Sequence, residues 1–424
     1  MLYPSDDVLY RIQVWVIPLF ILIASFEFAP LRYTNTLFVA VHIFAAPISS
    51  IYNLLCKIAA QQEIWDMSQV KSLDESVNKS LAILVVAYQD WSTLLTQLSS
   101  ESQENDIEAT STSFSSQTPK QMLTTLQDLL VDDSDPILRA HRVNECQIAA
   151  RELSDARKAG IGKMMIGTLN YFVALGMAFT HISKGDFNNR TGHSLAFGLL
   201  WTALLVIVWL SAIEGSFVTR HSVRMILSRL QRSLDRLEEI EGLREKSGQG
   251  STQKCVSYPE MKEKKKEKDT IVAERTPLQK PAIFNFYSIS SKNAKHAYSS
   301  LEGMGMNYCL TSSPPSSTAL KLTLVILSIL PVALSTAAAF IISFTSPTQG
   351  VGCRNIQQLS FFGAWIVSSI LSVVIGRTIK GVRGLWVERV KDGVVASFFC
   401  VFFTLGFVGM YLNPPSHKFF PRCL

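Results

Sequence analysis

Leu322–Phe344, with the sequence LTLVILSILPVALSTAAAFIISF, decides the fold of this chain because it contains no Asp, Glu, Lys or Arg. At ~1.5 Å per residue, a helix of this length crosses a hydrocarbon layer of ~30 Å. A charge-free apolar run of about 20 residues is the expected mark of a membrane helix. Six further runs lack these charged residues, so the sequence predicts an all-α membrane protein with about seven transmembrane helices: Ile12–Phe26, Tyr33–Cys56, Met164–Thr180, Ser194–Ile213, Asn355–Gly376 and Gly393–Ser416.

Two long polar segments separate these runs, and they account for a mean hydropathy of only +0.21. We expect both to be cytoplasmic loops that are partly disordered. The predicted organisation is a transmembrane hairpin over 1–56, a cytoplasmic loop with amphipathic helices and a disordered middle over 57–163, a second hairpin over 164–213, a basic cytoplasmic loop with a juxtamembrane helix and a disordered linker over 214–321, and three spans with an outer tail over 322–424.

The two loops each contain one recognisable helical pattern. Leu81–Tyr88 is apolar but too short to span, which favours a helix that lies at the membrane surface or packs under the bundle. In the second loop, leucines and a valine recur at alternating spacings of four and three over 223–237. This short heptad pattern is compatible with a helix packed on its own protein and also with a homodimer. The sequence leaves both interpretations open.

A run of lysines and glutamates, Lys262–Lys268, lies further along the second loop. Basic residues near a membrane attract anionic lipid at about 1 kcal/mol each. The interleaved glutamates weaken that attraction, so a solvated linker is the main interpretation and weak contact with anionic lipid is the alternative. The net charge of +6 concentrates beside the spans, which excludes a nucleic-acid footprint as its explanation.

Basic residues predict the orientation of the chain, because Lys and Arg concentrate in cytoplasmic loops. The segment 377–392, taken as a short connection between spans six and seven, holds five of them, and the loop 214–321 opens with five arginines. Alternation then places the N-terminus in the cytoplasm, the end of span one near Pro30 outside, and the C-terminus in the lumen or outside the cell. Asn189 begins an N-x-T sequon on the outer side, so we expect it to be glycosylated. The membrane is either the plasma membrane or an endomembrane.

Cysteine usage allows one disulfide and gives no zinc signal. Cys353 follows span five and Cys423 lies past span seven, so both fall in a compartment that permits oxidation. A disulfide between them is one interpretation, and two free thiols are the other. No CxxC pair and no Cys/His ligand spacing occurs in the sequence.

The chain carries no motif that names a reaction. It has no P-loop, no G-x-S-x-G and no H-E-x-x-H, so we expect no catalytic residues and no cofactor, and an enzyme is not favoured. Inside the spans, Glu27 and His42 are the notable ionisable residues. Burying either in hydrocarbon is costly unless it is paired, so we expect the two to face each other at similar depth. This pair is the predicted candidate site.

Three segments carry a resemblance. They are Ala150–Lys158 (ARELSDARK), Gly192–Gly198 (GHSLAFG) and Ser346–Arg354 (SPTQGVGCR). In this order the chain resembles a group of multipass membrane proteins of filamentous ascomycete fungi, over roughly residues 140–410. The resemblance implies a fungal source and an integral membrane location, and it supplies no catalytic residue.

Three classes of function remain open. A non-enzymatic scaffold, sensor or accessory protein explains two long loops without a catalytic constellation. A transporter or channel requires polar groups at the midplane or broken helices in paired positions. An intramembrane enzyme acting on a lipid-like, terpenoid-type substrate of secondary metabolism requires acidic residues that face a cavity, and Glu27 is the one carboxylate that the predicted spans hold well inside.

Overall fold

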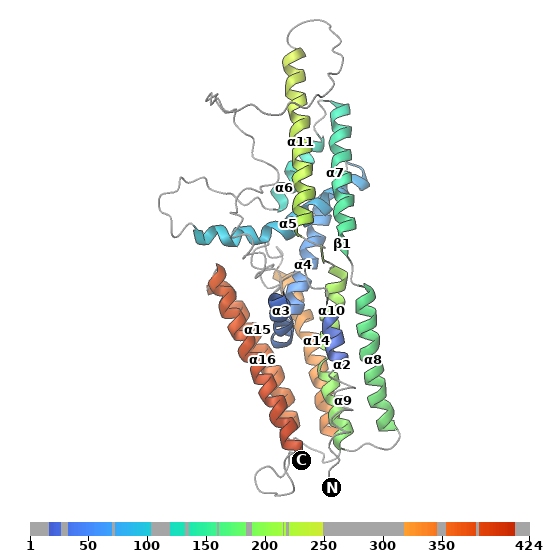
Figure 1. The fold of residues 1–424 in the computed structure, drawn as a ribbon, viewed down its shortest axis with the longest axis vertical. Helices are drawn as coiled ribbons and strands as arrows, with labels where there is room; N and C mark the ends of the chain where they lie inside the picture. The colour runs from blue at the N-terminus through green and yellow to red at the C-terminus, as the bar shows by residue number, and fades with distance from the viewer. Residues whose placement is uncertain are drawn as a thin grey trace.

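The structure is a computed structural model that describes residues 17–26, 33–69, 73–102, 119–131, 135–158, 161–183, 189–214, 216–217, 220–248, 318–345, 353–378 and 381–411. The described chain is helical, apart from one pair of two-residue strands (Figure 1). Its elements are α2 (Ile17–Ala24), α3 (Tyr33–Ala45), α4 (Pro47–Ser68), α5 (Glu75–Ser102), α6 (Pro119–Val131), α7 (Pro136–Ala156), β1 (Arg157–Lys158), α8 (Ile161–Ser183), α9 (Asn189–Leu200), α10 (Ala203–Glu214), β2 (Ser216–Phe217), α11 (Arg220–Gly248), α14 (Thr318–Thr345), α15 (Cys353–Thr378) and α16 (Gly381–Tyr411).

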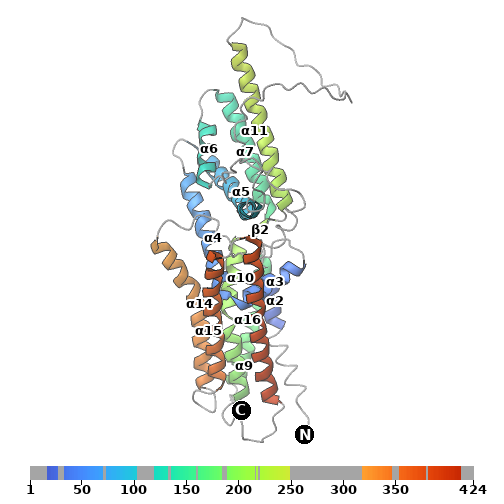
Figure 2. The same ribbon diagram turned by 90° about the vertical axis from the view of Figure 1, so that its left-hand side faces the viewer.

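The helices form two stacked parts, as Figures 1 and 2 show. We call α2, α3, α8, α9, α10, α14, α15 and α16 the apolar bundle, and α5, α6, α7 and α11 the helical layer. The antiparallel pair β1–β2 lies where α7 leads into α8 and α10 leads into α11, with Arg157 opposite Phe217. Each part has its own hydrophobic core.

The apolar bundle has the composition of a membrane domain. Large apolar side chains cover its outside, for example Ile166 and Leu169 on α8 and Leu334 on α14. Four described helices are long and apolar enough to cross a membrane, or five if a bent pair counts as one span. The predicted all-helical class and the apolar spans are confirmed at this level, whereas the structure does not support a count of seven.

Two of the predicted spans are interrupted. The predicted span Tyr33–Cys56 is two helices, α3 and α4, which meet at an angle of 106°. Pro47 occupies the first turn of α4, where its missing N–H and fixed φ suit a helix start and break the preceding helix. The predicted span Ser194–Ile213 is divided into α9 and α10 by a turn at Trp201–Thr202.

Two predicted boundaries are wrong. The segment 377–392 is not a connection, because α15 runs to Thr378 and α16 begins at Gly381. The boundary between 56 and 57 cuts through α4, which continues from the apolar bundle into the helical layer. Ile48 and Ile51 of α4 belong to the core of the bundle, while Ile64 belongs to the core of the layer.

The helical layer is a packed domain, where the sequence predicted loops with amphipathic pieces. Leu81, Leu84 and Val85 of α5 are fully buried in it rather than lying on a membrane surface. The heptad pattern of α11 packs against helices of the same chain, because its leucines at 227, 230 and 234 lie in the core of the layer. Burial in the core of the layer, together with the neighbouring charge of Glu145, raises the pKa of the Cys146 thiol to about 12.

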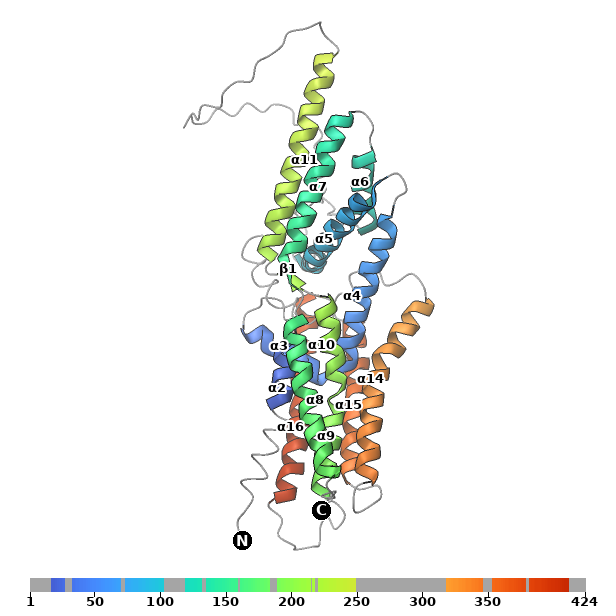
Figure 3. The same cartoon turned by 90° about the vertical axis from the view of Figure 1, so that its right-hand side faces the viewer.

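A close helix contact fixes α2 against α8. A Cβ atom on Gly167 of α8 would collide with the Ser25 side chain that follows α2, whose hydroxyl donates to Ile21 O at 2.7 Å. Gly167 lies in the part of α8 nearest to β1, so the C-terminal end of α2 faces the helical layer (Figure 3). The basic residues predicted that end of span one on the opposite side of the membrane from the two loops. Residues 1–16 and 27–32 lie outside the described residues, so the side on which Met1 lies stays a prediction.

We expect Gly167→Ala to lower the thermal unfolding temperature of the detergent-solubilised protein, because the new methyl group pushes α2 off α8. Overpacking of this kind costs about 1–3 kcal/mol. Gly176→Ala is the matched control, since a Cβ at Gly176 meets nothing within 4 Å. The control should be neutral or stabilising by up to about 1 kcal/mol, because alanine is the better helix former. Equal effects of the two substitutions would contradict the close contact.

Candidate functional site: a buried ionisable network

The buried face of α16 carries charge, while its exposed face is apolar. Glu388, Lys391 and Asp392 are all buried, whereas Trp386 and Val394 are about two-thirds exposed, at 67% and 65%. Residues three and four apart share one face of a helix, so the three charged groups point the same way. This is the reverse of a water-soluble helix, and it is the pattern expected where the surroundings are lipid and ionisable groups must face inward.

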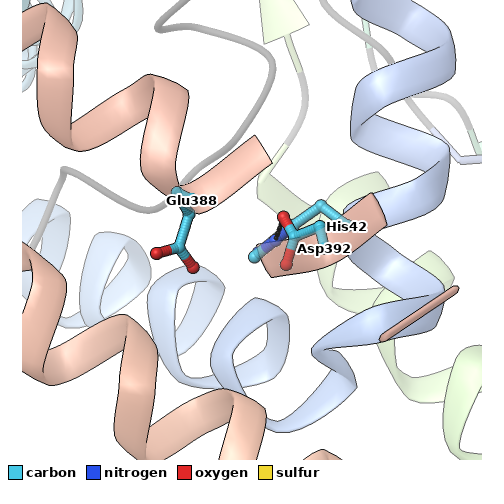
Figure 4. Close-up of side chains that lie close together, drawn as sticks. All are labelled: His42, Glu388 and Asp392. Carbon is cyan, nitrogen blue, oxygen red and sulfur yellow. Dashed lines mark hydrogen bonds and ion pairs between the residues drawn. The ribbon is translucent and has the colours of Figure 1, made fainter. Parts of the chain in front are cut away.

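The charged face of α16 meets His42 of α3. His42 Nδ1 lies 2.7 Å from Asp392 Oδ2, and both side chains are 2% exposed (Figure 4). An ionised carboxylate accepts hydrogen bonds and cannot donate one, so Nδ1 carries the proton and donates to Asp392. In the neutral ring Nε2 is then an acceptor, and it has no hydrogen-bond partner among the described residues.

Lys391 joins this pair to Glu388 and to α15. Its ammonium group lies 3.0 Å from Asp392 Oδ1 and forms a very short ion pair with Glu388 Oε1. It also donates to the Ser372 hydroxyl at 2.5 Å and to Ser368 O at 3.3 Å. The Ser372 hydroxyl in turn donates to Glu388 Oε1 at 2.5 Å.

Glu388 uses only one of its two oxygens in these contacts. Within the described part of the chain, Oε2 has no hydrogen-bond partner although the side chain is 2% exposed. One donor atom each from His42, Glu388 and Asp392 lies within 4.8 Å of the others. The network therefore brings together an imidazole and two carboxylates, the donor types that bind transition metals in proteins.

A second cation lies beside the network. The guanidinium group of Arg389 sits over the ring of Phe38 on α3, 4.6 Å from its centroid. Stacking a cation on an aromatic face is favourable when the cation is desolvated. The contact gives α3 and α16 a second attachment, on the side of α16 next to the ionisable face.

Aromatic residues enclose the two helix interruptions next to the network. Phe44, near the end of α3, packs edge-to-face on Trp201 at the α9–α10 turn, with ring centroids 5.3 Å apart. Trp365 of α15 packs on Trp201 at 5.9 Å, and its indole N–H donates to Phe44 O at 2.8 Å. The carbonyl groups at the end of a helix lack intrahelical donors, so this bond satisfies one of them in an apolar environment.

The predicted site residues have different outcomes. His42 is buried and paired as expected of an intramembrane histidine, but the partner identified by the structure is Asp392. Glu27, Cys423 and the Lys262–Lys268 run lie outside the described residues, and so do the contacts that would test them. Asn189 and Cys353 are the first residues of α9 and α15, and their predicted glycosylation and disulfide stay predictions.

Glu388, Lys391 and Asp392 were not predicted as site residues, because the predicted span seven begins at Gly393 and these residues were assigned to the connection before it. The signal that identifies them is their spacing at i, i+3 and i+4 directly before an apolar run. If the helix begins before Gly393, this spacing places all three on one face. Their partner His42 is 350 residues away from Asp392, and no local pattern indicates that pairing.

Comparisons of this chain with protein-family models, with curated proteins and with solved structures found no match. The resemblance to fungal membrane proteins therefore stays a prediction, and the network has to be interpreted from its own chemistry.

We expect a double-mutant cycle of His42→Ala and Asp392→Ala to show coupling in thermal unfolding. Removing one partner of a buried hydrogen bond costs about 1–3 kcal/mol, and more for a charged group, because the other partner is left unsatisfied. The second substitution should then cost less, with a coupling energy of about 1–3 kcal/mol. Asp66→Ala is the control, since Asp66 is exposed and accepts from Gln62 within the same helix. Additive effects of His42→Ala and Asp392→Ala would show that the pair contributes nothing to stability.

Proposed function

We propose that this chain is a non-enzymatic integral membrane protein, of the sensor or accessory class, that connects an intramembrane polar site to a cytosolic helical domain. The observation that carries the proposal is the course of α4. This helix begins at Pro47, next to the α3 segment that holds His42, and ends at Ser68 in the core of the helical layer. A continuous helix is stiff, so a shift of α3 at the network moves the part of the layer that packs on α4.

Polar contacts join the helices of the layer to one another and to α4, which supports the proposal that the layer responds to a movement of α4. Arg142 of α7 forms a short ion pair with Glu241 of α11 and donates to Leu129 O of α6 at 3.3 Å. Gln127 of α6 donates to Met67 O at the end of α4. These contacts join the helices of the layer, so a displacement of α4 is passed to the layer as a whole.

The proposal includes the sidedness predicted from the basic residues. The helical layer is cytosolic, and the ends of α8, α14 and α16 away from the layer face the lumen or the outside of the cell. Two features support this. Helix α16, whose first half carries several basic residues, contacts α5 of the layer, and α11 opens with several arginines in the layer itself. The membrane concerned is the plasma membrane or an endomembrane.

The test compares distances between spin labels on the two parts of the protein. Labels at Asp128→Cys on α6 and Thr323→Cys on α14 sit on exposed positions, in a chain whose accessible native cysteines are replaced by serine. We expect Lys391→Met to shift the distance distribution in lipid nanodiscs, because the network loses its central cation. Lys163→Met, at an exposed lysine of α8, should leave the distribution unchanged. Identical distributions for Lys391→Met and the unsubstituted chain would refute the connection between the site and the layer.

A transporter is the second candidate, and a specific observation favours it. The two interrupted helix pairs, α3–α4 and α9–α10, meet through Phe44 and Trp201, beside buried ionisable groups. Discontinuous helices that meet at a polar site are typical of secondary transporters. Proteoliposomes loaded with a proton-sensitive or a zinc-sensitive dye test this candidate. Flux that Asp392→Asn abolishes and Asp66→Asn retains would support transport, whereas flux equal to that of empty liposomes would exclude it for these two ions.

A further inference from the structure

We propose that His42 and Glu388 bind a divalent transition-metal ion of the Zn²⁺ class, with Asp392 as the carboxylate that orients His42. The inference deepens the proposed function, because it names the ligand of the same site. It rests on the proposal that this site acts on the helical layer. Its starting point is the orientation of the His42 ring, which two helices fix in the interior of the bundle.

The His42–Asp392 contact is the arrangement that metal-binding histidines use. Such a histidine donates one ring N–H to a carboxylate and binds the metal through the other nitrogen. Here Nδ1 donates to Asp392 Oδ2 at 2.7 Å, and Nε2 is buried without a partner among the described residues. The carboxylate thus sets the tautomer that leaves a lone pair on Nε2.

Glu388 supplies the second free donor atom. Its Oε2 is buried and, in the described structure, unpartnered, while Oε1 holds Lys391 and Ser372. Donor atoms of Glu388, Asp392 and His42 already lie within 4.8 Å of one another (Figure 4). Ligands bound to one Zn²⁺ lie at ~2.0–2.2 Å from the ion, so binding through Nε2 and Oε2 requires the side chains of His42 and Glu388 to turn toward a shared position.

Nitrogen and oxygen donors together favour a transition metal over Ca²⁺ or Mg²⁺, which prefer oxygen ligands alone. Lys391 is the natural competitor of the ion, because its ammonium group contacts both carboxylates. A bound metal must displace this group from Glu388. Lys391 therefore sets how tightly the site holds a cation, and its removal should strengthen metal binding.

The test measures Zn²⁺ binding to the tag-free, full-length protein in lipid nanodiscs by isothermal titration calorimetry, with Co²⁺ as a spectroscopic probe. We expect one buried site whose Co²⁺ complex shows visible absorption bands of a low-coordinate N/O environment. His42→Gln and Glu388→Gln should each weaken Zn²⁺ binding by about 100-fold or more. Asp392→Asn should weaken it by about 10–100-fold, as measured for partners that orient metal ligands.

Two further variants separate a loss of the metal site from a loss of folding. Lys391→Met should raise the Zn²⁺ affinity by about tenfold, an effect that a loss of folding cannot mimic. His141→Ala is the matched control, because His141 is exposed on α7 of the helical layer, and it should bind Zn²⁺ like the unsubstituted chain. The proposal is overturned if neither the unsubstituted chain nor Lys391→Met binds Zn²⁺, or if His42→Gln and Glu388→Gln bind it with unchanged affinity.

The same spin-label pair on α6 and α14 separates this inference from the proposed function. Zn²⁺ binding without any change of the label distance would support the metal site and refute its role as input to the layer. A distance change with Lys391→Met but no Zn²⁺ binding would refute the metal site and leave the connection between the site and the layer standing.

Discussion

The contact between His42 and Asp392 joins the first part of the chain to α16 inside the apolar bundle. Ionisable groups in lipid-like surroundings are stable only when each finds a partner inside the protein. Asp392 meets this requirement with His42 on one side and Lys391 on the other. Because the partners come from α3, α15 and α16, satisfying these charges fixes how the last two helices of the bundle meet the first part of the chain.

The interrupted helices follow from the same constraint. A helix that ends inside an apolar environment exposes carbonyl groups that need donors. The indole of Trp365 supplies one for Phe44 O, and the hydroxyl of Tyr171 donates to Gly198 O beside the α9–α10 turn. Tryptophan and tyrosine suit this position because each combines a large apolar body with one donor. The aromatic residues around Trp201 thus supply donors to backbone carbonyl groups at both helix breaks in the bundle.

The helical layer is built on a different principle from the bundle. Its helices have one apolar face each, and the leucines of α5, α6 and α11 close a core of the kind found in soluble proteins. The bundle instead keeps its polar groups inside and shows apolar side chains outside. Among the described helices, α4 is the one that contributes to both cores, so it is a main element through which the two parts constrain each other. A site in the bundle can act on the layer because their connection is a helix and not a flexible linker.

The sequence by itself determined the features that depend on composition and local period. Leu322–Phe344 predicts an apolar helix because burial of such a run in lipid needs no particular neighbour, and the spacing over 223–237 predicts a helix with one apolar face. The sequence did not say what covers that face, and α7 and α5 do so in the structure. It also could not give the start of α16, since the charges of Glu388 and Asp392 argue for a loop until their partners are known. Only the tertiary structure brings His42 to Asp392 across 350 residues, because their pairing depends on how α3 and α16 pack together and not on the local sequence.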